Sequence, residues 1–167
     1  YCLDHQLQVS SKISGLTIPN GLCWSPDSAI MYHTDTPTRR IYRYDFDAAS
    51  GAISNQSLLV HTEQACFPDG STVDAEGYIW SAQWAASRVV RYSPEGEIDF
   101  ILPLHVSQPT CVAFGGPDLN MFFITTAYQG MTPDARKAEP EAGNVFIFQT
   151  DIEGIADPRF QSLLRQE

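Results

Sequence analysis

The sequence predicts an all-β protein, a β-propeller built of four-stranded antiparallel blades. A proline followed by a polar residue introduces a short apolar strand three times, at Pro19, Pro68 and Pro109. These starts are 49 and 41 positions apart, with strand-like segments between them, which is the spacing of propeller blades. No apolar stripe with a period of 3.6 residues is sustained, and only residues 132–137 resemble a helical turn.

Composition narrows the class of protein. The chain has 167 residues, of which 43% are hydrophobic and 18% charged, as expected for one ordinary globular domain. Its net charge is −10 and its basic residues are scattered, which argues against a nucleic-acid partner. The sequence shows no signal peptide and no apolar run near the roughly 20 residues that a membrane span needs. We therefore expect no membrane partner and a cytoplasmic location.

The cysteines are expected to be free, buried thiols. Their spacing contains no C-x-x-C pair, and they are too few for a small disulfide scaffold. Two of the four stand inside apolar runs, where a thiol behaves as a small hydrophobic group. The four residues are Cys2, Cys23, Cys66 and Cys111.

The first part of the chain predicts the end of one blade and then a complete blade. Residues 1–18 contain two short strands around a polar turn. Residues 19–66 form the next unit, in which Ser25-Pro26-Asp27 makes a turn after the first strand. The segment 40–46 alternates in the period of two that a half-buried strand requires.

Two further units complete the prediction. Residues 67–108 form a second blade, with turns at 74–77 and 93–96 between its strands. Residues 109–167 form a last, incomplete blade that carries a long polar insertion. We thus expect a single partial propeller domain over 1–167. Because known propellers close with about 4 to 8 blades, the chain is expected to be truncated at its N-terminus.

Equivalent positions of the three units carry oxygen-bearing side chains, namely Asn20, Asp69 and Thr110. The first strand of each blade runs beside the central channel, so these side chains are expected to face one end of it. Amide, carboxylate and hydroxyl oxygens suit Ca²⁺ or Mg²⁺, and Mn²⁺ or Zn²⁺ can also use them. Pro68 fixes the approach to Asp69, and Gly70 lets another group come close. The alternative is that Asn20 and Asp69 only cap turns before their strands.

The sequence contains less evidence for other catalytic arrangements. The sequence has no G-x-S-x-G elbow, and no two of its four histidines have the spacing of metal ligands. His33 is interpreted as a buried, hydrogen-bonded group, and Asp35 as a structural residue that bonds a neighbouring blade. Turn roles are expected for three further aspartates, Asp27, Asp74 and Asp118.

Aromatic residues and one loop complete the set of candidates. The three tryptophans, Trp24, Trp80 and Trp84, are expected to pack between blades, with the channel mouth as an alternative for Trp84. Tyr128 and Gln129 precede a long loop of the kind that often covers a site.

Several of these motifs together resemble one family. They are Pro19-Asn20-Gly21-Leu22 with Trp24-Ser25-Pro26-Asp27, Asp35-Thr36-Pro37-Thr38-Arg39-Arg40-Ile41-Tyr42, Pro68-Asp69-Gly70 with Val73-Asp74-Ala75-Glu76-Gly77, Pro109-Thr110 with Ala113-Phe114-Gly115-Gly116, and Glu139-Pro140-Glu141-Ala142-Gly143. In this order, over about residues 1–160, the chain resembles the regucalcin (senescence marker protein), gluconolactonase and luciferin-regenerating enzyme family.

The resemblance implies a six-bladed propeller with a divalent metal ion in its channel, of which this chain would be the C-terminal half, about three and a half blades. It implies that Asn20 and Asp69 are metal ligands and that Asp69 is also the general base of a metal-dependent sugar lactone hydrolase. The residue types agree, since a cation polarises a carbonyl while a carboxylate takes a proton from water.

The sequence also departs from the family pattern. Ser71 stands where methionine is frequent, and Tyr128-Gln129 replaces a pair that is often more basic. The family's metal-binding glutamate, a further asparagine, and an arginine and a second glutamate that contact sugar belong to an N-terminal half without counterpart here. The chain alone is therefore expected to be weakly active or inactive. Its expected partner is the missing N-terminal blades, with a second copy as the alternative.

Two other functions remain as alternatives to the lactonase. One is a calcium-binding regulatory propeller without turnover, which would use the same Asn20 and Asp69. The other is a scaffold propeller in which these two residues only cap strands.

Overall fold

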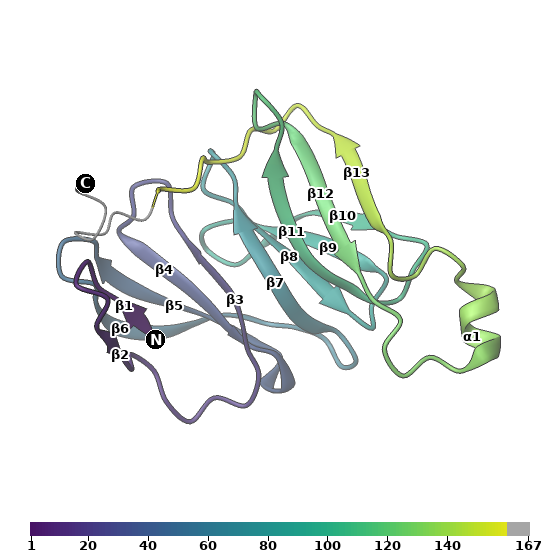
Figure 1. The fold of residues 1–167 in the computed structure, drawn as a ribbon, viewed down its shortest axis with the longest axis horizontal. Helices are drawn as coiled ribbons and strands as arrows, with labels where there is room; N and C mark the ends of the chain where they lie inside the picture. The colour runs from purple at the N-terminus through teal and green to yellow at the C-terminus, as the bar shows by residue number, and fades with distance from the viewer. Residues whose placement is uncertain (160–167) are drawn as a thin grey trace.

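The structure is a computed structural model that describes residues 1–159. It is built of antiparallel sheets, and the described part contains one short α-helix and one turn of 3₁₀ helix. Figure 1 shows the sheets following one another along the long axis of the molecule. The all-β prediction of four-stranded antiparallel sheets is confirmed for two of them.

The first sheet has the strand order β3-β4-β5-β6. Its strands are β3 (Pro19–Trp24), β4 (Ile30–Asp35), β5 (Arg40–Asp47) and β6 (Ala52–His61), and the 3₁₀ turn η1 (Thr36–Thr38) links β4 to β5. The last strand, β6, is long because β5 and β6 form a hairpin in which Asp47 pairs with Ala52.

The second and third sheets repeat this arrangement. The second has the order β10-β9-β8-β7, with β7 (Phe67–Val73), β8 (Ile79–Trp84), β9 (Arg88–Tyr92) and β10 (Ile98–Pro103). The third has three strands among the described residues, β11 (Pro109–Gly115), β12 (Met121–Thr126) and β13 (Val145–Gln149). The polar insertion between β12 and β13 holds the helix α1 (Pro133–Ala138), which Thr132 caps by accepting a hydrogen bond from the Ala135 N–H.

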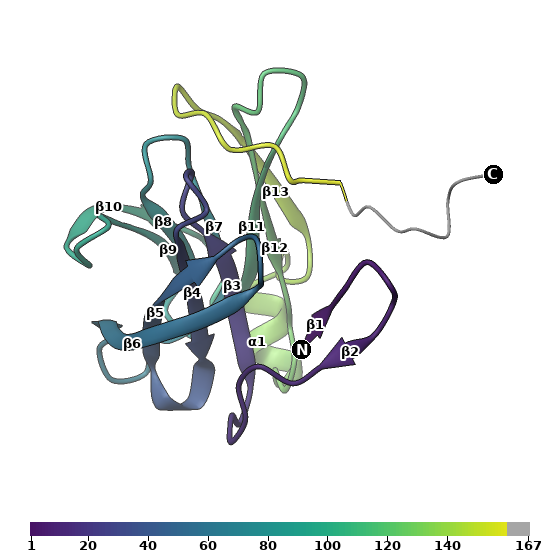
Figure 2. The same ribbon diagram turned by 90° about the vertical axis from the view of Figure 1, so that its left-hand side faces the viewer.

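The N-terminal residues form a separate two-stranded hairpin of β1 (Cys2–Leu3) and β2 (Val9–Ser10). Figure 2 shows it standing apart from the strands of the first sheet. The chain then runs to Pro19, where β3 begins. No described helix is long and apolar enough to cross a membrane.

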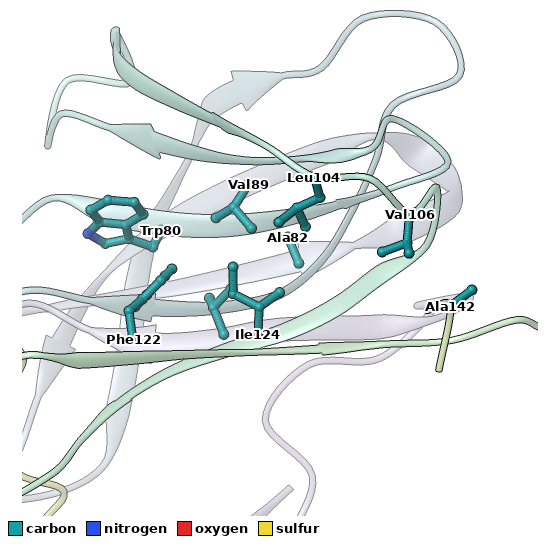
Figure 3. Packing of buried hydrophobic residues seen from close by; sticks show 9 residues of the cluster. Trp80, Ala82, Val89, Leu104, Val106, Phe122, Ile124 and Ala142 are labelled. Carbon is teal, nitrogen blue, oxygen red and sulfur yellow. The ribbon is translucent and has the colours of Figure 1, made fainter. Parts of the chain in front are cut away.

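The core lies between the sheets. Between the second and third sheets, Trp80, Ala82 and Val89 of one pack against Phe122 and Ile124 of the other (Figure 3). The ring centroids of Trp80 and Phe122 lie 4.7 Å apart. The prediction that Trp80 packs between blades is therefore confirmed.

Between the first and second sheets the core is smaller. Cys23 and Tyr32 pack against Val73 and Ile79 in one cluster. Ile41, Val60, Val90 and Tyr92 form a second cluster farther out. In each sheet the residues alternate between one face and the other, so every strand gives part of its side chains to each neighbouring layer.

Asp74 does more than the turn role that the sequence suggested. It is fully buried and accepts hydrogen bonds from Trp80 Nε1 at 2.8 Å and from Arg91 Nε at 2.9 Å. Arg91 also pairs with Asp99 and Glu76, and its guanidinium lies 3.8 Å from the centre of the Tyr78 ring. The aspartate holds its turn through the backbone N–H groups of Glu76 and Tyr78 and also anchors an ionic cluster.

Candidate functional site

The inner strands of the three sheets bring the predicted oxygen-bearing column together. β7 packs between β3 and β11, so these strands lie side by side at the centre of the molecule (Figure 1). Asn20, Asp69 and Thr110 each directly follow a proline, which is the first residue of β3 and β11 and the second residue of β7. They therefore occupy the same end of three neighbouring strands.

A β-bulge accompanies each member of the column. The pairing register shifts between Asn20 and Cys23 in β3, between Pro68 and Ser71 in β7, and between Pro109 and Cys111 in β11. A bulge bends a strand and turns side chains away from the regular alternation, and bulges are frequent beside active sites. The three bulges fall where the polar residue follows the proline. The repeated sequence motif therefore coincides with a repeated irregularity of the backbone.

Two glycines let the inner strands approach closely at this level. A Cβ atom on Gly21, whose φ is +54°, would lie 3.0 Å from the Asp69 main-chain oxygen. A Cβ atom on Gly70 would lie 2.5 Å from the sulfur of Cys111. The close approach predicted at Gly70 therefore exists, and the group that fills it is Cys111 of the next strand.

A single hydroxyl links the column across two sheets. Asn20 Nδ2 donates a hydrogen bond of 2.9 Å to Thr36 Oγ1, and this hydroxyl donates one of 2.8 Å to the main-chain oxygen of Pro68. Because the NH₂ group of Asn20 is engaged, its Oδ1 atom is left as an acceptor. Sequence reasoning gave Thr36 no role, since a contact between residues 32 positions apart depends on how the sheets pack.

Asp69 carries an uncompensated carboxylate. Its side chain is half-buried, and no described cation lies within ion-pair distance. Burial raises the pKa of Asp69 to about 6, and a hydrogen bond from the Gly70 backbone N–H opposes the rise only in part. A half-buried carboxylate without a cationic partner tends to bind a cation or to take up and release a proton.

The Thr110 hydroxyl is less available as a ligand than the side-chain oxygens of Asn20 and Asp69. Its hydroxyl is 2.6 Å from the Thr125 hydroxyl of the neighbouring strand, so part of its hydrogen-bonding capacity is used within the third sheet. Cys111, the next residue, faces Gly70, and partial desolvation of its sulfur raises the pKa of the thiol. All four cysteines are free, as predicted, but the expected burial holds only for Cys23 and Cys66, since Cys2 is partly exposed and Cys111 is exposed.

The column would supply only some of the ligands that a cation with oxygen ligands needs. In residues 1–159 no three His, Cys, Asp or Glu side chains gather closely enough to hold a metal ion. Asn20 Oδ1 and the Asp69 carboxylate offer two oxygen-bearing groups of the hard type that Ca²⁺, Mg²⁺ and Mn²⁺ accept. The donor chemistry is right, and the number of donors from one chain is small.

A cavity of about 860 Å³ reaches the column from the side of the first sheet. Asn20, Gly21, Gly70 and Ser71 form its wall near the column. His33 also lines it, is only 5% exposed, and has neither ring nitrogen hydrogen-bonded. The expected burial of His33 is confirmed, but the expectation that it is hydrogen-bonded is wrong, because the cavity leaves it without a protein partner. Burial lowers the pKa of His33, although the nearby Asp35 opposes this.

The remaining candidates have structural contacts. Asp27 has its predicted turn role, accepting from the Ser25 hydroxyl and the Ala29 N–H. Asp35 is structural as expected, but its carboxylate accepts from the Thr17 and Ile18 N–H groups that lead into β3. The ring of Tyr128 lies 3.9 Å from the Arg136 guanidinium, within the insertion that carries α1.

The profile of a family described as "SMP-30/Gluconolactonase/LRE-like region" matches residues 1–128. The chain belongs to this family. Its likeness to curated members is spread over nearly its whole length. It is 36% identical to a putative sugar lactone lactonase of Rhizobium meliloti, over 92% of this chain and 53% of that protein. It is 35% identical to the pentonolactonase XacC of Haloferax volcanii, over 98% and 57% respectively.

Solved structures of SMP-30/gluconolactonase/LRE-like proteins share the fold. A calcium-binding protein, regucalcin, of Agrobacterium tumefaciens superposes with a TM-score of 0.85 at 33% identity, over 95% of this chain and 53% of that one. A luciferin-regenerating enzyme superposes with a TM-score of 0.82 at 32% identity, over 92% and 52%. The chain thus spans about half the length of the family members it matches.

Proposed function

We propose that this chain carries the acid–base and metal-binding part of a divalent-metal-dependent hydrolase of sugar lactones. The observation that supports this most is that Asn20 and Asp69 stand at the same end of two adjacent inner strands, each at a bulge. Relatives named as lactonases of pentoses and other sugars support the substrate class.

In the proposed reaction Asp69 is the general base. Its carboxylate takes a proton from the water that attacks the lactone carbonyl, and returns it to the ring oxygen as the C–O bond breaks. Without metal, burial holds the pKa of Asp69 at about 6, and a bound cation would lower it, so the carboxylate is ionised and able to accept a proton at pH 7. The half-buried position keeps bulk water from screening the charge.

Asn20 and Asp69 would hold the divalent ion through their side-chain oxygens. When bound, the ion would polarise the lactone carbonyl and stabilise the oxyanion that forms on it. Asn20 is held for this role by Thr36, which fixes the amide with its Oδ1 atom free. Ca²⁺, Mg²⁺, Mn²⁺ and Zn²⁺ can each use amide and carboxylate oxygens as ligands.

The test compares lactone opening by the wild-type chain, Asp69→Asn and Asn20→Ala in a pH-stat, with D-glucono-1,5-lactone and a pentonolactone, each with EDTA or Mn²⁺. We expect at most a weak Mn²⁺-dependent rate above that of buffer, which Asp69→Asn abolishes. Glu97→Ala, exposed in the turn that leads into β10, should keep the rate and serves as the control. Mn²⁺ binding without turnover in the wild type would favour the calcium-binding regulatory alternative, and no binding would leave the scaffold alternative.

A further inference from the structure

Gly21 makes a contact between β3 and β7 directly beside the proposed ligand Asn20. A Cβ atom on Gly21 would lie 2.9 Å from Ser71 Oγ and 3.0 Å from the main-chain oxygen of Asp69, both in β7. It would also lie 2.5 Å from Thr34 Oγ1, in β4 of its own sheet. The lack of a side chain at Gly21 therefore lets β3 approach the backbone of the residue that carries the proposed base.

The atoms around Gly21 have little freedom to give way. Thr34 is fully buried, is β-branched and pairs with Asn20 in the ladder of the first sheet. Ser71 is held in the ladder between β7 and β8, and the third atom belongs to the main chain of Asp69. Since other heavy atoms do not approach a Cβ atom to less than about 3.0 Å, a side chain at Gly21 would have to push β3 and β7 apart.

The contact at Gly21 is steric. Thr34 Oγ1 and Ser71 Oγ are both buried, and neither has a hydrogen-bond partner among the residues that the structure describes. Removing either hydroxyl would therefore make room at Gly21 without breaking a hydrogen bond within residues 1–159. The crowding can thus be relieved by substitution of these two residues.

The Thr36 hydroxyl limits the same spacing in the opposite direction. It accepts a hydrogen bond of 2.9 Å from Asn20 Nδ2 and donates one of 2.8 Å to the main-chain oxygen of Pro68. A hydrogen bond weakens as its atoms separate, so this link limits how far β3 can move from β7. Gly21 sets how closely the two strands can approach. Together the two contacts fix the distance of Asn20 from the backbone of Asp69.

We propose that Gly21 is a positioning residue that sets the separation of the Asn20 and Asp69 side chains, and thereby their joint affinity for a divalent ion. The inference rests on the proposed function, in which these two side chains are ligands. Oxygen ligands lie at about 2.0 to 2.6 Å from Mg²⁺ or Ca²⁺, so a small shift of one strand lengthens a ligand bond beyond this range. A Cβ atom on Gly21 would force such a shift, because 2.5 Å to Thr34 Oγ1 lies far inside the 3.4–4 Å of an ordinary contact.

The test is Mn²⁺ binding by the EDTA-treated chain, measured by isothermal titration calorimetry, in the wild type, Gly21→Ala and Gly77→Ala. Gly77 is the matched control, because its φ is also positive, at +90°, but a Cβ atom there would meet nothing closer than 3.8 Å. Gly77→Ala thus carries the strain of a positive φ without the crowding. We expect Gly21→Ala to bind Mn²⁺ about 10-fold more weakly and Gly77→Ala to bind it like the wild type. Equal affinity in Gly21→Ala and the wild type would overturn the proposal.

A second comparison separates crowding from general damage to the fold. Adding Thr34→Ala and Ser71→Ala to Gly21→Ala removes both crowding hydroxyl groups, so part of the lost Mn²⁺ affinity should return. No recovery in this triple variant would overturn the proposal, because the loss would then come from the strained backbone of Gly21. Circular dichroism and thermal unfolding establish that every variant is folded at the temperature of the titration.

Nuclear magnetic resonance of the metal-free chain tests the positioning independently of ion binding. The resonances of the Asn20 side-chain amide and of the Asp69 carboxyl should shift in Gly21→Ala and stay in place in Gly77→Ala. Such shifts, in a chain whose wild type does not bind Mn²⁺, would support the positioning and contradict the proposed metal-dependent function. Unchanged resonances in Gly21→Ala would overturn the positioning itself.

Discussion

Thr36 reaches from the link after β4 to the second sheet and donates a hydrogen bond of 2.8 Å to the main-chain oxygen of Pro68. The same hydroxyl oxygen accepts a hydrogen bond from the side-chain amide of Asn20. The position of one proposed ligand is therefore tied to the backbone beside the other, Asp69. Groups that orient metal ligands in this way influence affinity strongly even though they do not touch the ion.

Replacement of Thr36 by valine should weaken divalent-ion binding. Valine keeps the shape of threonine but removes both hydrogen bonds, which frees the Asn20 amide to rotate. We expect Mn²⁺ affinity to fall by about 10- to 100-fold, measured by isothermal titration calorimetry. Thr36→Ser keeps the hydroxyl and is the control. Equal affinity in Thr36→Val and the wild type would show that the hydroxyl does not position Asn20.

Gly70→Ala should destabilise the contact between the second and third sheets. The added Cβ would lie 2.5 Å from the sulfur of Cys111 and 2.7 Å from its Cα, so the strands must separate. Overpacking of this kind costs about 1–3 kcal/mol of unfolding free energy, which urea titration measures. Because the backbone of Cys111 also blocks the space, the added change Cys111→Ala should restore little. Full recovery in the double variant would mean that only the sulfur obstructs.

The positions of Asn20 and Asp69 could be predicted from the sequence, whereas the contacts around them could not. The repeated proline and polar residue predicted that Asn20 and Asp69 occupy equivalent strand positions, because such local patterns set where strands begin. The pattern could not predict that the Thr36 hydroxyl links Asn20 to the backbone beside Asp69, since that contact depends on the distance between two sheets. The unpartnered His33 was missed for a related reason, because the packing of the segment 11–16 over the first sheet is not encoded in any local pattern.

Asp74→Ala should be far more damaging than a change at an ordinary turn. It would leave the buried Arg91 without its most buried carboxylate partner and the Trp80 N–H without an acceptor. Breaking a buried ion pair costs about 3–5 kcal/mol, although Asp99 and Glu76 still neutralise part of the Arg91 charge. Asp27→Ala removes an exposed turn aspartate and should cost about 1 kcal/mol or less. Similar urea midpoints for the two variants would contradict a central role for the Arg91 cluster.

Asp69→Asn should stabilise the metal-free protein while abolishing its proposed chemistry. The pKa of Asp69 is about 6 in the folded protein and near its usual 3.8 when unfolded, so between these values the folded state binds more protons. Stability should therefore fall as pH rises from about 4 to 7, and asparagine, which carries no charge, should remove this part of the decline. Because Asp69 is only half-buried, we expect a gain on the order of 1 kcal/mol at pH 7.5 in EDTA, or a few degrees in Tm. Thermal unfolding of both proteins at pH 4.5 and 7.5 gives the comparison. A variant less stable than the wild type at pH 7.5 would show that the Asp69 carboxylate has a favourable partner even without metal.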